Sequence, residues 1–127
     1  MNRKKSIFLT IAILFVLVGC TSVDQETAEI YAAKAEDVIL LLNEQNFEEL
    51  YQNFDEKMST DLTVQEMETH VAPVIEESGE FQSFDQFSVE NKQGYYVVVV
   101  GTKYSDVNRV YTITFDQQEK IAGLYVK

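Results

Sequence analysis

Cys20 is the residue best suited to covalent chemistry, and it is the only cysteine among the 127 residues. A cysteine thiolate is a nucleophile, and a chain with one cysteine cannot form an internal disulfide. Gly19 precedes it and is small enough to leave the peptide bond between the two residues open to a peptidase. The residues alone allow two interpretations. Cys20 is either a site of modification beside a cleavage point or an incidental cysteine of a secreted protein.

The segment before Cys20 predicts an export signal. Arg3, Lys4 and Lys5 form a basic start, and residues 7–18 are apolar except for one threonine. This run of 12 residues has the length of the apolar core of a signal peptide. A membrane-spanning helix needs about 20 apolar residues. We therefore expect a short signal helix whose basic end stays in the cytoplasm, with the rest of the chain exported.

The tetrapeptide Leu17-Val18-Gly19-Cys20 resembles the bacterial lipobox. The resemblance implies a diacylglyceryl group on the Cys20 sulfur and cleavage between Gly19 and Cys20. Two acyl chains on one residue are sufficient for stable anchoring. Residues 1–19 would be the cleaved signal peptide, residues 20–23 the lipidated cysteine with a tether of about 15–25 Å, and residues 24–127 the domain. The expected location is the outer face of the bacterial cytoplasmic membrane, and no cofactor other than the covalent lipid is expected.

Charge is distributed unevenly along the chain. The first 19 residues hold three of the ten basic residues, so the remainder carries seven basic and 21 acidic residues, a net charge of −14. Residues 24–90 hold 18 acidic and two basic side chains, whereas residues 91–127 hold three acidic and five basic ones. This balance argues against nucleic acid or anionic lipid as a ligand of the first half, and no nucleic-acid partner is expected. A soluble acidic surface is the simpler explanation, and a face for a cationic partner is the alternative.

Hydrophobic periodicity predicts three helices in the first half of the domain. Residues 28–42 repeat at helical spacing after Asp24, a good N-cap. Residues 47–58 predict a second helix, with Asn46 as its cap. A capping box at residues 63–66 opens the third, which Gly79 ends. Pro73 lies inside this third helix, so we expect a kink just before it.

From residue 81 onward the period changes to two, which predicts four strands. They are expected at residues 81–90, 95–104, 107–115 and 121–126, separated by polar turns. Both faces of residues 95–104 are apolar, which indicates a central strand covered on both sides. Gly123 marks a bend or close backbone approach in the last strand. The predicted fold class is α+β, with three helices packed on a curved four-stranded antiparallel sheet in the order ααα-ββββ.

Five short segments, in their order and spacing, resemble a bacterial envelope family known as domain of unknown function 3887. The segments are residues 46–51, 54–58, 62–67, 79–81 and 121–125. The resemblance covers nearly the whole domain. It implies a cystatin-like cone fold of the nuclear-transport-factor-2-like type, found alone as lipoproteins or fused to exported hydrolases. It implies no catalytic residues, because none are established for the family.

Other residues offer little catalytic chemistry. His70 is the only histidine, and no nucleophile or orienting partner stands beside it. The chain has no histidine pair, and its one cysteine is expected to be lipidated, so a zinc site is not expected. The acidic pairs lack the alternating spacing and glycine of a calcium loop, so no metal site is expected.

Seven tyrosines are the remaining feature. The simpler interpretation is a core with hydroxyl groups at its rim. The functional alternative is a cone pocket for an apolar or amphipathic ligand, lined by Tyr51, Phe54, Tyr96, Tyr111 and Tyr125. We therefore expect a non-catalytic binding domain at the membrane, with a membrane-proximal protein or a small apolar ligand as partner. The alternative is an isomerase-like enzyme that uses this pocket with Asp55 or Asp85.

Overall fold

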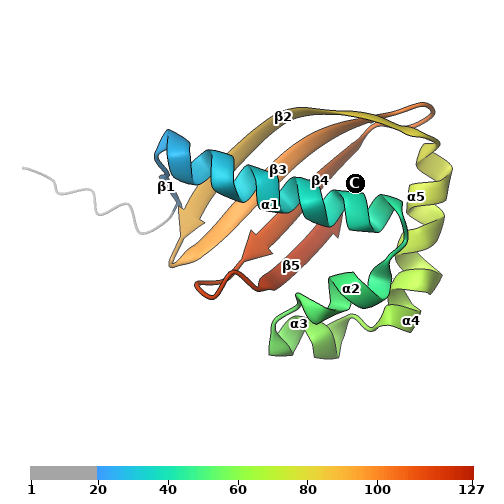
Figure 1. Cartoon of the computed structure of the whole chain (residues 1–127), viewed down its shortest axis with the longest axis horizontal. Helices are drawn as coiled ribbons and strands as arrows, with labels where there is room; N and C mark the ends of the chain where they lie inside the picture. The colour runs from blue at the N-terminus through green and yellow to red at the C-terminus, as the bar shows by residue number, and fades with distance from the viewer. Residues whose placement is uncertain (1–19) are drawn as a thin grey trace, which may run out of the picture.

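α1 (Gln25–Asn43) is the longest helix, and it lies across one face of the sheet (Figure 1). It begins where Asp24 accepts a hydrogen bond from the Thr27 amide at 3.2 Å, as expected for an N-cap. The apolar residues on one face of α1 recur at helical spacing and are buried, as the sequence predicted. The computed structural model describes residues 20–127, so the expected signal helix at residues 1–19 lies outside the described part of the chain.

The predicted second helix is divided into α2 (Phe47–Gln52) and α3 (Glu56–Asp61). Between them Phe54 forms a parallel bridge with Ile121, and the amide of Asp55 donates to the Ile121 carbonyl at 2.9 Å. Asp55 then caps α3 with its side chain. The expected helix over residues 47–58 was wrong at this point, because backbone bonds to the last strand replace helical ones.

The third predicted helix contains a π-helical turn at the expected kink. α4 (Val64–Glu66) starts at the capping box that Thr63 opens, and η1 (Met67–Val71) leads into α5 (Ala72–Ser78). Pro73 has no N–H, and its ring would clash with the carbonyl four residues back in a regular α-helix. A wider turn placed just before it accommodates both effects.

The strands form one antiparallel sheet in the order β1-β2-β3-β4-β5 (Figure 1). Four of them match the predicted strands closely, which confirms the α+β class and the order of elements. The fifth, β1, was not predicted. The bounds are β1 (Cys20–Ser22), β2 (Phe81–Lys92), β3 (Tyr95–Tyr104), β4 (Arg109–Phe115) and β5 (Ile121–Val126).

β1 changes the prediction for the residues that follow the expected cleavage site. Its backbone pairs with the end of β2, with Cys20 opposite Lys92 and Ser22 opposite Glu90. The expected free tether at residues 20–23 is therefore largely a strand of the sheet.

The sheet has one covered and one open face. The even-numbered residues of β3, such as Val98 and Val100, point toward the helices and are buried. The odd-numbered residues, including Val97 and Val99, are only partly buried, because no described element packs over them. The expectation that both faces of this strand are covered was wrong. The helices all lie on one side.

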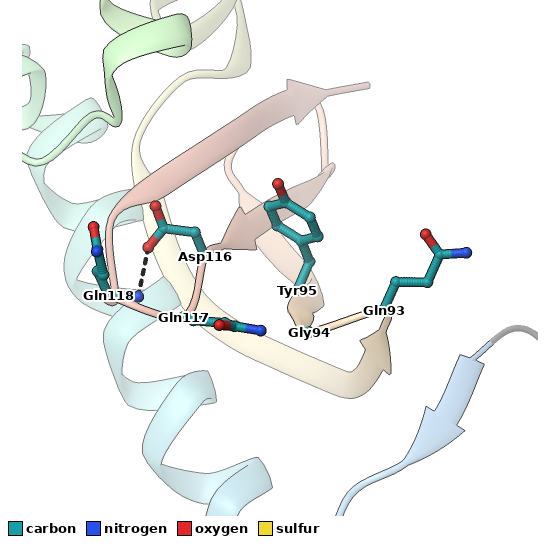
Figure 2. A pocket seen from close by; sticks show the side chains of 6 residues that line it. All are labelled: Gln93, Gly94, Tyr95, Asp116, Gln117 and Gln118. Carbon is teal, nitrogen blue, oxygen red and sulfur yellow. Dashed lines mark hydrogen bonds between the residues drawn. The ribbon is translucent and has the colours of Figure 1, made fainter.

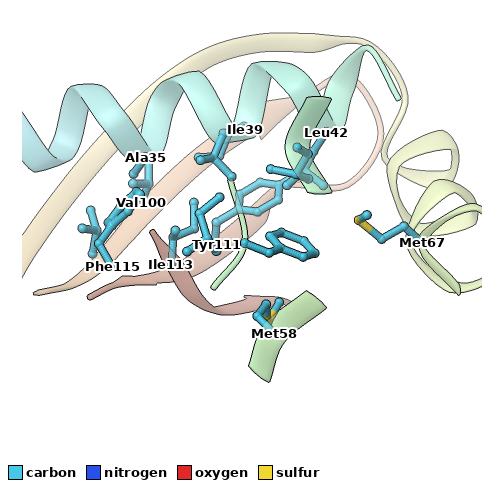
Figure 3. Close-up of a cluster of buried hydrophobic side chains, with 14 of the residues drawn as sticks. Ala35, Ile39, Leu42, Met58, Met67, Val100, Tyr111, Ile113 and Phe115 are labelled. Atoms are coloured by element: carbon cyan, nitrogen blue, oxygen red, sulfur yellow. The ribbon is translucent and has the colours of Figure 1, made fainter. Parts of the chain in front are cut away.

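The core fills the space between α1, the shorter helices and the inner face of the sheet (Figure 3). Side chains with almost no exposed surface come from every layer. They include Ile39, Leu42, Leu50, Met67, Val98, Tyr111, Ile113 and Ile121.

Two glycines, Gly79 and Gly123, lie where the chain leaves little room for a side chain. Gly79 ends α5 with φ of 83°, and a Cβ there would overlap the side chain of Ser105, so only glycine fits. Gly123 lies opposite Thr114, next to a register shift between β4 and β5. A Cβ on Gly123 would lie 3.3 Å from Thr114, which agrees with the predicted close approach.

Candidate functional site

The five residues predicted to line a cone pocket do not share one. Tyr111 is 0 % exposed and Tyr125 is 61 % exposed. The residue opposite Tyr125 is Thr112, the neighbour of Tyr111 along β4. Since successive side chains alternate between faces, Tyr111 points into the core and Tyr125 points to the open face. A single pocket cannot contain both, so the predicted pocket was wrong.

The other three predicted pocket residues take part in local packing. Tyr51 and Phe54 have ring centres 5.8 Å apart, and the Tyr51 hydroxyl donates to the Ser59 carbonyl at 3.0 Å. Tyr96 stacks on Tyr31 of α1 with ring centres 4.0 Å apart and planes at 15°. These contacts fix α2 and α1 against their neighbours, which is the simpler interpretation given above for the tyrosines.

A buried chain of hydroxyl groups crosses the core instead. The Tyr104 and Tyr111 hydroxyl oxygens are 2.6 Å apart, and the Tyr104 hydroxyl donates to Oδ1 of Asn43 at 2.5 Å. Since the single Tyr104 proton goes to Asn43, Tyr111 is the donor to Tyr104. Sequence reasoning missed Tyr104 and Asn43. The even-numbered pattern of β3 would have placed Tyr104 inward, but nothing pointed to Asn43.

The surroundings of these hydrogen-bonded hydroxyl groups favour the neutral form of both tyrosines. Burial raises the pKa of Tyr111, and its hydrogen bond to Tyr104 raises it further. Burial also raises the pKa of Tyr104, although bonds to Tyr111 and Asn43 partly oppose this. Nδ2 of Asn43 is buried without a hydrogen-bond partner among the described residues. Both hydroxyls are hydrogen-bonded to protein groups. This series of side chains therefore contributes to core packing and satisfies the two buried hydroxyl groups.

The carboxylates named for an enzyme lie apart from these tyrosines. Asp55 caps α3, accepting from the Met58 amide at 2.7 Å. Asp85 lies on β2 with an exposed side chain, and His70 is exposed in η1. Within residues 20–127 no three histidine, cysteine or acidic side chains gather in a way that could hold a metal ion.

A groove with an apolar floor lies between α1, α2 and the β4–β5 connection. It encloses about 270 Å³. The floor is formed by Val38, Leu41, Phe115 and Ile121, and the rim is polar. On the rim, Lys34 and Glu119 form an ion pair at 3.2 Å. Val38, Phe115 and Ile121 are almost completely buried, so Leu41 supplies most of the accessible apolar surface of a groove whose lining is otherwise polar.

A second hollow, of about 370 Å³, lies between the β2–β3 and β4–β5 turns (Figure 2). Its lining is mostly polar and comprises Gln93, Gly94, Tyr95, Asp116, Gln117 and Gln118. One oxygen of Asp116 accepts from the backbone amides of Gln118 and Lys120, at 2.8 and 2.9 Å. That carboxylate therefore shapes the turn, whereas the amide side chains and the Tyr95 ring line the opening.

Backbone pairing places Cys20 at the same end of the molecule as this hollow. Cys20 is opposite Lys92, immediately before the β2–β3 turn. Figure 1 shows β1, the start of α1 and this turn together at one end, with α5 at the other. Among the described residues, no helix has the length and apolar character needed to cross a bilayer.

Helices on one face of an antiparallel meander define a small α+β domain with an open sheet face. The model of a family described as protein of unknown function (DUF3887) matches residues 35–124, and the chain belongs to this family. A protein from Ruminococcus gnavus ATCC 29149, solved by NMR, has a similar fold with a TM-score of 0.65 at 20 % identity. The similarity covers 81 % of this chain and 90 % of that one. No curated protein matches this sequence.

Proposed function

We propose that this chain is a lipid-anchored extracytoplasmic protein with a non-catalytic binding domain at the membrane surface. The observation that carries the proposal is the lipobox-like sequence ending at Cys20, the only cysteine. A basic start and a short apolar run precede it, as in export signals. The buried core cluster of the described residues runs from Tyr31 to Ile121, so cleavage before Cys20 would remove none of it.

Metabolic labelling with a palmitate analogue tests the anchor. The full-length chain should incorporate label, and Cys20→Ala should incorporate none, because the acceptor sulfur is gone. Thr21→Ala is the matched control and should label like the wild type, because it changes the next residue without removing the sulfur. Equal labelling of Cys20→Ala and wild type would disprove the anchor.

The groove beside α1 supports the binding role. Its floor is apolar and its rim carries Lys34, Asp37, Glu49 and Glu119, which suits a small apolar ligand or an apolar side chain of a membrane-proximal protein. The isomerase-like alternative has weaker support. Tyr111 is enclosed in the core, and Asp55 and Asp85 lie on other elements, at the start of α3 and on β2.

Site-specific photo-crosslinking in intact membranes tests the groove. A crosslinking amino acid at Leu41, on the floor, should capture the ligand or protein partner. The same amino acid at Ile30, an exposed aliphatic residue elsewhere on α1, is the control and should capture it at least several-fold less. Equal capture at both positions, or none at Leu41, would argue against the groove as the binding site.

A further inference from the structure

The β2–β3 turn lies where a lipid anchor would hold it against a bilayer. Cys20 and Lys92 are directly opposite in an antiparallel pair, and such pairs have Cα atoms about 4.5–5.5 Å apart. Resting on the anchor proposed above, we infer that residues 91–95 form a membrane-contacting surface. Its partner is the headgroup region of the bilayer that holds the acyl chains.

The residues of this turn suit a bilayer interface. Lys92 and Tyr95 are opposite each other at the end of the hairpin, and Tyr95 is 47 % exposed. Between them lie only Gln93 and Gly94, which are uncharged. Tyrosine rings favour the boundary between apolar and aqueous surroundings, and a lysine can bury its stem while its ammonium group stays at the headgroups.

The turn is held rigidly enough to present this surface. Gln93 and Gly94 both have positive φ, 53° and 88°, as in the two-residue hairpin turns that match strand twist. The Gly94 amide donates to Oδ1 of Asn91 at 3.1 Å. Strand pairing sets the backbone at both ends of the turn, at Lys92 and Tyr95, relative to the backbone of Cys20.

Charge supports the same orientation. Residues 91–104 contain no acidic residue, whereas residues 24–90 contain 18 of the 21. Anionic lipids attract nearby lysines and repel carboxylates. Of the acidic groups at this end, Asp116 is bonded to backbone amides and Glu119 is paired with Lys34, while Asp24 and Glu26 lie at the start of α1. Glu90 lies two residues further from the tip, so the tip itself is the least repelled part of this end.

Tryptophan fluorescence can test the orientation, because the chain has no tryptophan. The buried core residues of the described chain lie between Tyr31 and Ile121, so a chain that begins at Cys20 contains all of them and is expected to fold. Its only cysteine is coupled to a maleimide lipid in vesicles of phosphatidylcholine and phosphatidylglycerol at a ratio of about three to one, a composition that supplies anionic headgroups. The probe is Tyr95→Trp, and lipids brominated on their acyl chains are the quencher.

The matched control is Tyr125→Trp, an exposed tyrosine on the open face of the sheet. Quenching of Tyr95→Trp should exceed that of Tyr125→Trp at least twofold. Tyr95 and Tyr125 lie on the same face of the sheet, so equal quenching would mean that the domain turns freely about its anchor or lies with this face flat on the bilayer. Stronger quenching of Tyr125→Trp would mean that the open sheet face lies on the bilayer. Either result overturns the inference.

A charge reversal separates contact from mere proximity. In the Tyr95→Trp background, Lys92→Glu should reduce quenching at least twofold in these anionic vesicles. Lys103→Glu, the same change near the other end of β3, should have little effect, and equal effects would contradict the inference. The maleimide lipid supplies the anchor, so this test does not depend on lipidation in the cell. The palmitate labelling above tests that step separately.

Discussion

Tyr104 satisfies the hydrogen-bonding needs of two other buried groups. It accepts from Tyr111, whose side chain has no exposed surface, and donates to Asn43. Tyr104→Phe would leave the Tyr111 hydroxyl and the Asn43 oxygen without partners, a loss of about 1–3 kcal/mol of stability. Tyr111→Phe leaves the bond from Tyr104 to Asn43 intact and should cost only about 0.5–1.5 kcal/mol.

Urea unfolding of the two variants measures this difference. The ring volumes are the same in both substitutions, so packing changes cancel in the comparison. A larger loss for Tyr111→Phe than for Tyr104→Phe would contradict the assigned direction of the hydroxyl chain.

The same tyrosines predict a loss of stability at high pH. Burial raises the pKa of Tyr111 and Tyr104 in the folded state, whereas an unfolded tyrosine titrates near pH 10. Below about pH 10 both tyrosines are protonated in the folded and the unfolded states. The stability that the two buried hydroxyls contribute is then fully present. As pH rises further, the unfolded chain loses protons first, so stability falls by about 1.4 kcal/mol per pH unit for each such group.

Unfolding free energies of wild type and Tyr111→Phe at pH 9 and pH 11 test this dependence. The variant should lose about 1.4 kcal/mol less than wild type over this interval, because it has one fewer buried hydroxyl to ionise. Other titrating groups contribute equally to both proteins. Identical losses would show that Tyr111 is accessible to titration in the folded state.

At the scale of elements, two of the three proposed helix caps, Asn46 and Thr63, behave differently. The Thr63 hydroxyl accepts from the Glu66 amide at 3.2 Å, and the Glu66 carboxylate accepts from the Thr63 amide. Asn46 makes no capping bond and contacts only the exposed Glu49 side chain. Thr63→Ala should therefore cost about 1 kcal/mol of stability, and Asn46→Ala should cost clearly less.

Thermal or urea unfolding followed by circular dichroism distinguishes the two variants. The caps begin α4 and α2, two short helices of the same layer, which makes the pair a matched comparison. An equal loss in both variants would mean that the capping bonds of Thr63 do not persist in solution.

Hydrophobic periodicity predicted the type and order of the helices and strands, because each of them buries one face. It failed between α2 and α3, where residues 47–58 have helical spacing although backbone bonds to Ile121 break the helix. It also could not reveal β1, because three residues are too few to show alternation. The predicted pocket failed for a related reason. Whether Tyr111 and Tyr125 share a face depends on the register across the β4–β5 turn, which the sequence alone does not show.

For the molecule as a whole, most acidic residues precede the β2–β3 turn, beside which the proposed anchor residue Cys20 lies. Residues 24–90, which include all the described helices, carry a net charge of −16. Residues 91–127, which form β3 to β5, carry +2. An acidic helical layer is repelled by anionic lipids and by neighbouring copies. A domain held at its β2–β3 turn would keep α4 and α5, at the far end in Figure 1, away from the bilayer.

Self-repulsion in the acidic layer predicts that salt stabilises the domain. The Debye length falls from about 30 Å at 10 mM salt to well under 10 Å at 500 mM, which weakens repulsion more than it weakens the few close ion pairs. A gain of about 1 kcal/mol would raise Tm by about 4–8 °C for a domain of this size. Glu44 is the most informative position, since it caps the C-terminal end of α1, where the last turn has no basic residue.

A negative charge at that end opposes the helix dipole, so Glu44→Gln should stabilise the protein by about 0.3–1 kcal/mol at 10 mM NaCl. The rise in its Tm on adding 500 mM NaCl should be smaller than the rise for wild type, because the substitution has already removed part of the repulsion. Glu68→Gln, an exposed change in η1, controls for loss of one charge away from a helix end. Differential scanning calorimetry across the salt range provides the measurement. A fall in Tm with added salt would show that attractive pairs, rather than repulsion among the acids, dominate the electrostatics of the folded domain.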